Sequence, residues 1–192
     1  MQPRQQIRQT IRHARRQLSR KQQTEAAQKV AARFMALPDV MNAQRIALYL
    51  SFDGELDTQP VIKACWQAEK NVYLPVIHPF SHGHLLFLQY HPHTRMRINR
   101  YGISEPTLDI RTLTPSSKLD VIATPLVAFD ADGQRLGMGG GYYDRTLGLC
   151  APNSTAIGLA HDCQHWHPLP SEQWDMPLSH ILTPSQHWHW PA

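Results

Sequence analysis

The sequence predicts an α/β fold: a single-domain, open, mostly parallel sheet with helices on both faces and a small β-hairpin or meander insertion. Two patterns lead to this prediction. Apolar runs of strand length alternate along the chain with stretches of helical periodicity, which is typical of α/β sheets. Several of these runs are apolar almost without interruption, as in strands buried on both faces of a parallel sheet. With 192 residues, 42% of them hydrophobic, we expect one domain over residues 1–192.

The first predicted element is a basic helix over residues 3–18 that packs on the rest of the domain. One apolar stripe runs along it at four-three-four spacing and consists of Ile7, Ile11, Ala14 and Leu18. Ser19 and Gln22 then match a capping box, which predicts the start of a second helix. That helix ends at Pro38, and its predicted core face consists of Ala27, Val30, Ala31, Phe34 and Leu37.

A βαβ unit follows, with strands over residues 45–51 and 71–77 and a helix over 61–69 between them. Such a unit pairs its two strands in parallel through a right-handed crossover. The next stretch is polar and rich in histidine, with alternation at 84–90 and 94–99, and we expect it to form the insertion. The remaining predicted elements are a turn at 101–106, a buried strand within 119–130, a short helix at 142–150, a strand at 155–161 and a short last strand at 180–185.

The positive charge of the chain is concentrated at its start. Residues 1–21 contain seven basic residues and no acidic one, so the rest of the chain carries −3, since the total is +4. A basic segment of this kind is compatible with a solvated helix face, with nucleic-acid binding, or with a few cations aimed at a small anionic ligand. Composition alone leaves these three alternatives open.

The expected location is the cytoplasm. No apolar run approaches the roughly 20 residues that span a bilayer, so we expect no membrane contact. The start of the chain is polar and Arg-rich, without the apolar region of a secretory signal. Three scattered cysteines do not form a disulfide framework and suit a reducing compartment.

The segment "GQRLGMGGGYYDR", residues 133–145, contains three consecutive glycines between a predicted strand and a predicted helix. It is either a mobile surface turn or a loop whose backbone N–H groups surround phosphates. It lacks the Lys and hydroxyl of a P-loop, so phosphate charge would be neutralised by Arg135 nearby or by Arg4 and Arg8 at the N-terminus. Asp144, and Asp175 further along, are candidate Mg²⁺ ligands, although each also suits an ordinary role at a helix start or in a surface loop.

Taken together, these segments resemble the 5-formyltetrahydrofolate cyclo-ligase family, also called methenyltetrahydrofolate synthetase. The resemblance runs nearly from end to end, and the glycine segment, in the form R-L-G-x-G-x-G-[YF]-[YF]-D-R, is its most specific part. The other matching stretches are Arg4 with Arg8, "YLSFDGELDT", "YLPVI", "YGISEP", "AFDADG" and "EQWDMPLSHILT". The resemblance implies cyclisation of 5-formyltetrahydrofolate to 5,10-methenyltetrahydrofolate with ATP and Mg²⁺, through phosphorylation of the formyl oxygen.

The resemblance also implies a role for individual residues. Arg135, Tyr142 and Arg8 would act at the reacting groups, and Asp144 and Asp175 would hold Mg²⁺. The residues expected at ATP are Arg4, Arg8, Arg135, Leu136, Gly137, Met138, Gly139, Gly140, Gly141, Tyr142 and Tyr143. Those expected at the folate are Leu50, Glu55, Tyr101, Met138, Gly139, Gly140, Gly141 and Tyr142. Small molecules are thus the expected partners, with no nucleic acid, and a monomer is the expected state.

Three rival interpretations remain. The first is a zinc protein, because histidines two apart on a strand share a face, although here they fall in loop-like stretches. Its candidate ligands are Cys163 and the pairs His82/His84, His91/His93, His165/His167 and His187/His189. The second is a nucleic-acid-binding module that uses the Arg-rich helix. The third keeps the fold and the ATP site but acts on another substrate, such as a thiamine-related one.

Overall fold

The computed structural model describes residues 3–190. The strands of its main sheet are β1 (Arg45–Ala47), β2 (Asn71–Ile77), β3 (Leu85–Gln89), β6 (Leu113–Thr114), β7 (Val121–Thr124), β10 (Thr155–Leu159), β11 (His180–Leu182) and β12 (His187–His189). They lie in the order β12-β11-β10-β7-β1-β2-β3-β6. The strands from β11 to β2 are parallel, whereas β12, β3 and β6 join antiparallel at the edges. The predicted mostly parallel sheet is confirmed.

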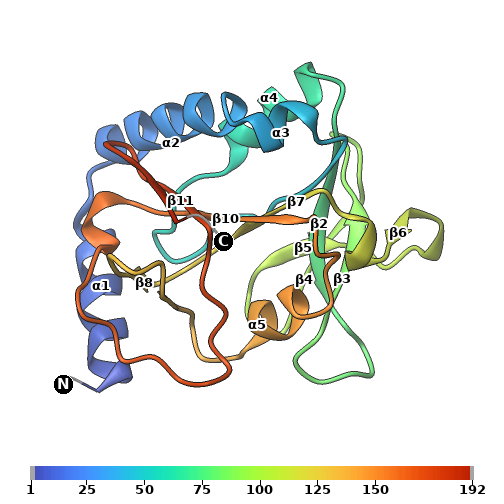
Figure 1. Cartoon of the computed structure of the whole chain (residues 1–192). Coiled ribbons are helices and arrows are strands. Elements are labelled where there is room, and N and C mark those ends of the chain that lie inside the picture. The colour runs from blue at the N-terminus through green and yellow to red at the C-terminus, as the bar shows by residue number, and fades with distance from the viewer. Residues whose placement is uncertain (1–2, 191–192) are drawn as a thin grey trace.

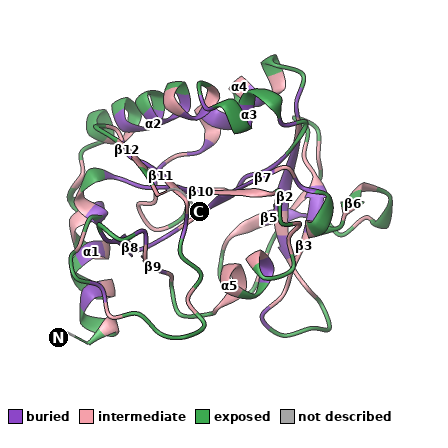
Figure 2. Ribbon diagram, in the orientation of Figure 1, coloured by how far each residue is buried: buried purple, intermediate pink, exposed green. Residues whose placement is uncertain are grey.

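Helices lie on both faces of this sheet (Figure 1). The α-helices are α1 (Arg4–Gln17), α2 (Arg20–Met35), α3 (Pro38–Asn42), α4 (Gln59–Gln67) and α5 (Tyr142–Leu147), and the 3-10 helices are η1 (Ile110–Thr112), η2 (Ser116–Lys118) and η3 (Asp162–Gln164). Side chains of neighbouring strand residues point to opposite faces. Ile46 belongs to the core cluster under α2 and α4, whereas Ala47 belongs to the cluster that contacts α5. Figure 2 shows the sheet buried between these layers and the outer faces of the helices exposed.

The second helix forms as its sequence predicts. Ser19 caps α2 and accepts a hydrogen bond from Gln22 N at 3.3 Å, while the Gln22 side chain accepts one from Ser19 N at 2.8 Å. The predicted core face is buried throughout, and Phe34 is fully enclosed. This face anchors α2 on the sheet, but the helix ends at Met35, and Pro38, its predicted end, instead begins α3.

Helix α1 packs on a small hairpin instead of on the main sheet. This hairpin pairs β8 (Ala128–Phe129) with β9 (Arg135–Leu136), and Ile7 and Ile11 pack against it. The predicted apolar stripe is wrong at Ala14 and Leu18, which are only half-buried, because Arg15 occupies the buried position. Asp53 compensates the burial of the Arg15 guanidinium. Its carbonyl oxygen accepts a hydrogen bond from Arg15 Nη2 at 3.0 Å, and its carboxylate lies 3.6 Å away. Arg12 and Arg16 bind the same carboxylate, so these arginines are structural.

Several predicted boundaries are corrected. The strand expected over 45–51 ends at Ala47, and the strand expected last, β11, is followed by β12. The insertion is two hairpins, because β3 pairs with β2, whereas β4 (Met96–Ile98) pairs with β5 (Ser104–Pro106). The turn expected at 101–106 therefore leads into a strand. No helix among residues 3–190 is long and apolar enough to cross a bilayer.

Candidate active site

A cavity of about 490 Å³ opens beyond the carboxyl ends of β1 and β7, the place where ligands bind in parallel sheets. One side, which we call the apolar wall, is formed by Leu50, Leu74, Pro75, Ile77 and Leu126. Other lining residues come from the glycine segment, among them Arg135 and Asp144. Among the described residues, no cysteine or histidine lines this cavity.

The glycine segment connects β9 to α5 in backbone conformations that favour glycine. Gly139 has φ 101° and Gly141 has φ 64°, the left-handed region that side chains disfavour. At Gly140 a Cβ atom would lie 2.8 Å from the Tyr142 ring. Residues 137–141 thus form an ordered loop that brings its backbone and Tyr142 to the cavity, and the single strand expected within 119–130 is divided into β7 and β8.

Arg135 forms the buried end of an ion pair. Its Nη2 donates to Asp144 Oδ1 at 2.6 Å, and its side chain is only 2% exposed. Burial lowers the pKa of Arg135, and the neighbouring Asp144 opposes this shift. Within residues 3–190, its Nε finds no hydrogen-bond partner. A buried guanidinium with an unused donor is well suited to receive an anion.

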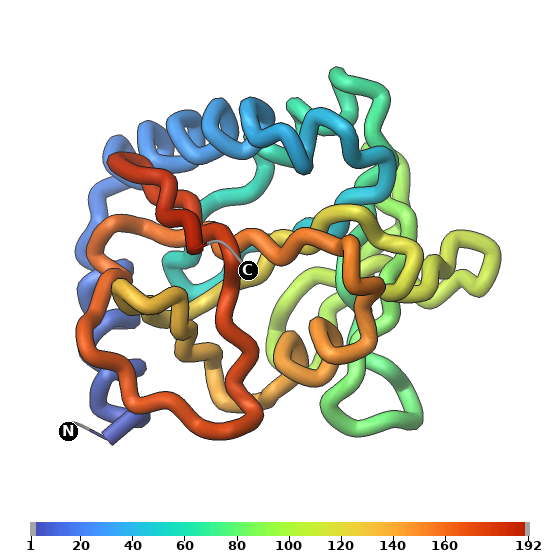
Figure 3. Tube along the Cα trace, in the orientation of Figure 1, coloured from blue at the N-terminus to red at the C-terminus, as the bar shows by residue number. Residues whose placement is uncertain are grey.

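The N-terminal helix reaches the same place from the other end of the chain (Figure 3). Arg8 Nε donates to Gly137 O at 2.8 Å, and Arg4 makes a two-pronged ion pair with Asp175 at 2.7 and 2.9 Å. The Arg4 hydrogen bond lowers the pKa of Asp175 against the opposing effect of burial. We call Arg4, Arg8, Arg135, Asp144 and Asp175 the charged cluster, which carries three cations and two anions.

Two tyrosines face each other at the cavity mouth. The Tyr101 and Tyr142 hydroxyls are 3.1 Å apart, and their rings meet edge to face at an interplanar angle of 83°. Arg100 Nη2 also donates to the Tyr142 hydroxyl, at 2.8 Å. Burial raises the pKa of Tyr142, but hydrogen bonds with Tyr101 and Arg100 outweigh it and lower the pKa. Tyr101, which is half exposed, offers an aromatic face to a planar ligand.

Glu55 is a titratable group in the cavity lining. Its Oε2 accepts a hydrogen bond from Phe52 N at 3.1 Å. Burial raises its pKa from 4.5 to about 7, and the opposing charge of Arg15 limits the rise. Glu55 is therefore a carboxyl group that changes its charge near neutral pH inside the cavity.

The structure gathers most of the predicted site residues and separates a few. Cavity-lining residues among them are Leu50, Glu55, Tyr101, Arg135, Gly137, Met138, Gly140, Gly141, Tyr142, Tyr143 and Asp144. Arg4, Arg8, Gly139 and Asp175 lie outside the lining, although Arg8 approaches Gly139. The Leu136 side chain is buried against Ile7 and Ile11, and its carbonyl oxygen accepts a hydrogen bond from Val127 N, so it does not line the cavity.

Sequence analysis missed a buried polar group in the cavity wall. Glu105 has a 3% exposed side chain that accepts hydrogen bonds from Arg97 Nε, Asn99 Nδ2 and Ile77 N at 3.0 to 3.1 Å. Asn99 in turn accepts from the backbone N–H of Tyr101 and so holds the turn that carries this ring. No local pattern marks Glu105, because its partners come from two other stretches of chain, one at Ile77 and one at Arg97 and Asn99.

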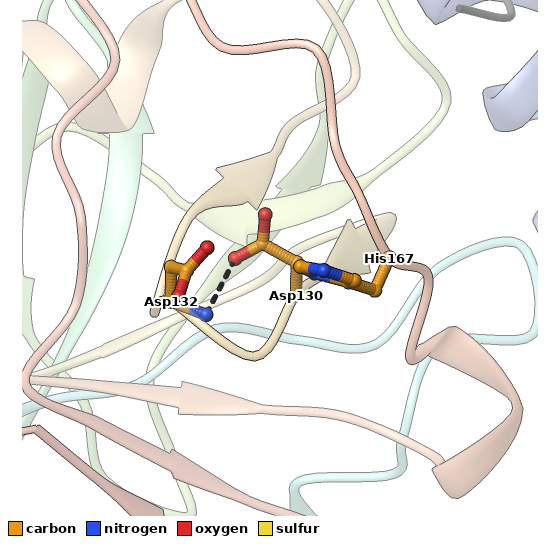
Figure 4. A group of neighbouring side chains, drawn as sticks. All are labelled: Asp130, Asp132 and His167. Atoms are coloured by element: carbon orange, nitrogen blue, oxygen red, sulfur yellow. Dashed lines mark hydrogen bonds between the residues drawn. The ribbon is translucent and has the colours of Figure 1, made fainter.

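The predicted metal ligands, Asp144 and Asp175, are each paired with an arginine and do not form a ready cluster of three ligands. Within residues 3–190, one group of three His, Cys, Asp or Glu side chains has its possible ligand atoms within 4.8 Å of one another. It consists of Asp130, Asp132 and His167 (Figure 4). It lies at the β8–β9 turn, outside the cavity lining.

Comparison with known proteins identifies the family. Residues 1–184 match the model of the 5-formyltetrahydrofolate cyclo-ligase family. This chain belongs to that family. The 5-formyltetrahydrofolate cyclo-ligase of Escherichia coli (strain K12) is 56% identical over 181 residues, which cover 94% of this chain and 100% of the relative. The enzyme of the same name from Haemophilus influenzae is 50% identical over 182 residues, covering 94% of this chain and 97% of the relative.

Solved structures show the same architecture. The NMR structure of Aquifex aeolicus 5,10-methenyltetrahydrofolate synthetase superposes with a TM-score of 0.84 at 28% identity, covering 97% of this chain and 92% of the other. The predicted family, the predicted α/β fold class and the prediction that this protein is a cyclo-ligase enzyme are confirmed.

Proposed function

We propose that this enzyme converts 5-formyltetrahydrofolate and ATP into 5,10-methenyltetrahydrofolate, ADP and phosphate, with Mg²⁺ as cofactor. The observation that carries the proposal is the cavity itself, which is lined by Arg135 and Asp144 of the charged cluster and by the apolar wall with Glu55 and Tyr101. A triphosphate suits the charged residues. A flat ring with polar groups at its edge suits the apolar wall with Glu55 and Tyr101. The matched relatives carry names that fit this reaction.

In the proposed reaction the formyl oxygen attacks the γ-phosphate, and ADP leaves. The folate N10 then bonds to the formyl carbon, loses its proton, and phosphate leaves with the former formyl oxygen. No covalent bond to the protein is needed, which agrees with a cavity in which the described residues include no cysteine or histidine. Charge stabilisation and positioning are sufficient for phosphoryl transfer of this kind.

Arg135 is the group best placed to stabilise the transferring phosphate. It is buried, its Nε is unused, and the glycine segment lies directly beside it. A cation enclosed in this way interacts more strongly with a developing negative charge than one in water. Arg8 contacts the same segment from the other side, and Tyr142 lies between this region and Tyr101.

The donor atoms of Asp144 and Asp175 suit Mg²⁺, which prefers carboxylate and phosphate oxygens. Bound Mg²⁺ would neutralise part of the phosphate charge. Both carboxylates now pair with Arg135 and Arg4, and phosphate oxygens are alternative partners for these arginines. The two carboxylates would then be free to serve as ligands.

The direct test is the ATP-dependent appearance of the 5,10-methenyl chromophore from 5-formyltetrahydrofolate, with ADP measured in parallel. We expect both products in equal amounts, and neither when ATP or Mg²⁺ is omitted. Active protein that releases ADP only with a different acceptor, such as a thiamine-related compound, would contradict the proposed substrate. Absence of both products with a folded protein would contradict the reaction.

A further inference from the structure

Three histidines gather on one side of the β11–β12 edge, away from the cavity. His180 on β11 pairs directly with His189 on β12, and their rings stack at 4.5 Å between centroids. His187 lies two residues before His189, so its side chain points to the same face. Its ring stacks on His180 at 5.2 Å. Of the four H-x-H pairs in the sequence, His187/His189 alone lies wholly on a strand of the described chain, contrary to the expectation of a loop.

Two ring nitrogens in this group face each other at a distance that suits one shared ion. His180 Nδ1 and His187 Nε2 are 3.0 Å apart. Two imidazole nitrogens bound at about 2.0–2.1 Å to the same ion lie roughly 2.9–3.4 Å apart, depending on whether its geometry is square or tetrahedral. In the structure these two nitrogens share a hydrogen bond, so binding one ion needs the tautomer of one ring to change and both lone pairs to turn toward the ion.

The surroundings of His180 favour a free lone pair on Nδ1. Its other nitrogen, Nε2, lies 3.9 Å from Asp39 Oδ2 at the start of α3. A carboxylate at this distance makes no hydrogen bond to Nε2, but its charge favours the tautomer that carries the proton there and leaves Nδ1 available. Thr155 on β10 donates to the second Asp39 oxygen at 3.2 Å and so orients the carboxylate.

The histidines are also kept neutral. Burial, followed by the charges of His189 and His187, lowers the pKa of His180. Burial, His189 and Arg33 lower the pKa of His187. Arg33, on α2, is the cation that faces this group, and it donates to the carbonyl oxygens of Pro184 and Ser185. Neutral imidazole is the form that binds metals.

We propose that His180 Nδ1 and His187 Nε2 form a two-imidazole site for a transition-metal ion of the Cu²⁺, Ni²⁺ or Zn²⁺ class. The ion joins β11 to the edge strand β12, and water occupies its remaining positions. The site is distinct from the cavity, because neither histidine lines it.

The group at the β8–β9 turn is the competing location for such an ion. There the Asp130 carboxylate is already engaged, since Oδ1 accepts from Asp132 N and Gln134 N, and Oδ2 accepts from Leu169 N. Its hard oxygen donors suit Mg²⁺ or Mn²⁺ better than the softer ions that imidazole prefers. The two locations are therefore distinguishable by both metal and mutation.

The test is titration of the full-length protein with Cu²⁺ at neutral pH, followed by calorimetry and electron paramagnetic resonance. We expect one tight equivalent, nitrogen hyperfine structure from two imidazoles, and a higher melting temperature with the ion bound. His180→Ala and His187→Ala should each weaken the affinity at least tenfold and remove the rise in melting temperature. Cyclo-ligase activity without metal at this site should be unchanged, which checks that both variants fold.

The matched control is His91→Ala/His93→Ala, which removes an exposed H-x-H pair from a loop and should leave the affinity as in the unmodified protein. The proposal is wrong if the His180→Ala/His187→Ala double variant binds Cu²⁺ as tightly as the unmodified protein. It is also wrong if Asp132→Ala/His167→Ala removes the tight equivalent instead, or if the unmodified protein shows no tight equivalent.

Discussion

The apolar wall lines the cavity and the charged cluster reaches it through Arg135 and Asp144, but the two are held in different ways. Residues of the apolar wall, such as Leu74 and Ile77, belong to or follow strands of the sheet, so packing fixes them before any ligand arrives. In the charged cluster, Arg4 and Arg135 are fixed by ion pairs with Asp175 and Asp144. One side is thus a preformed surface, whereas the other is a set of charges that can exchange partners when an anion binds.

The difference has a physical consequence for the two substrates. Binding at the apolar wall gains from burial of nonpolar surface and depends little on salt. Binding at the charged cluster replaces existing ion pairs, so its net gain is smaller than the number of arginines implies and depends on salt and on Mg²⁺. Variants of the two sides should therefore affect different substrates.

Arg135→Ala should have the largest effect. Loss of a buried cation that stabilises developing phosphate charge lowers kcat by about 10²–10³-fold. The measurement is steady-state formation of the methenyl chromophore, with a thermal melt to verify folding. Arg111→Ala is the matched control, because it removes an Arg–Asp pair of the same 2.6 Å length that lies exposed and outside the cavity lining. A rate within threefold of normal for Arg135→Ala would remove Arg135 from the mechanism.

Arg4→Ala should come next and should act mainly on ATP. A hydrogen bond to a charged group contributes about 1.5–3 kcal/mol, which corresponds to a rise of about 10–150-fold in KM for ATP. Arg4→Lys keeps the charge but lacks the planar guanidinium. Its KM for ATP should lie between those of the unmodified protein and of Arg4→Ala. Both variants are compared by varying ATP at saturating folate. An equal rise in KM for both substrates would contradict a role at the phosphates.

Glu55→Gln should change the pH dependence of folate binding. Burial raises the pKa of Glu55 to about 7, so its carboxylate becomes protonated as the pH falls below 7. The protonated group is a poorer acceptor for N–H donors of the ligand. We expect KM for 5-formyltetrahydrofolate to rise by about tenfold per pH unit below that point, and the slope to vanish in Glu55→Gln. An unchanged pH profile in the variant would show that another group titrates.

Glu55 should also affect stability, with a defined sign. Its folded pKa lies above the usual 4.5, so between these values the folded state holds more protons than the unfolded state. Ionisation of Glu55 therefore costs stability as pH rises from about 4.5 to above 7. Glu55→Gln should be more stable relative to the unmodified protein at pH 8 than at pH 5, as measured by urea unfolding at both values.

Tyr101→Ala should have the smallest effect on this list. An aromatic pair contributes about 0.5–1.5 kcal/mol beyond burial, or about 2–13-fold in KM for the folate. Tyr101→Phe keeps the ring and should stay near normal, although it loses the hydroxyl contact with Tyr142. If Tyr101→Phe is as impaired as Tyr101→Ala, the hydroxyl and not the ring carries the role.

Much of the fold was predictable because local patterns determined it. Strand β2 covers the predicted residues 71–77, and the capping box at Ser19 marks the start of α2. The burial of Arg15 was not predictable, because a charged residue reads as solvated until its partner is known. That partner, Asp53, lies far along the chain, in a left-handed conformation with φ 53°. The β8–β9 hairpin was missed because two-residue strands carry no periodic signal.

The candidate site shows the same difference between residues that a local pattern marks and residues that depend on distant contacts. Arg135, Tyr142 and Asp144 were found because they belong to one short segment with an unusual number of glycines. Arg4 and Arg8 were proposed as its distant cations because the segment lacks the Lys of a P-loop, and the contact between Arg8 and Gly137 agrees with this. Glu105 was missed, since its place in the cavity wall depends on contacts that only the folded chain creates.

The most direct test of the two-sided cavity is calorimetric binding of each substrate alone to Arg135→Ala and Glu55→Gln. Arg135→Ala should lose affinity for a nonhydrolysable ATP analogue with Mg²⁺ by at least tenfold and keep its affinity for 5-formyltetrahydrofolate. Glu55→Gln, measured at pH 8 where Glu55 is ionised, should show the reverse. If both variants lose both ligands equally, or if Arg135→Ala weakens the folate and leaves the nucleotide unchanged, the assignment of the two sides is wrong.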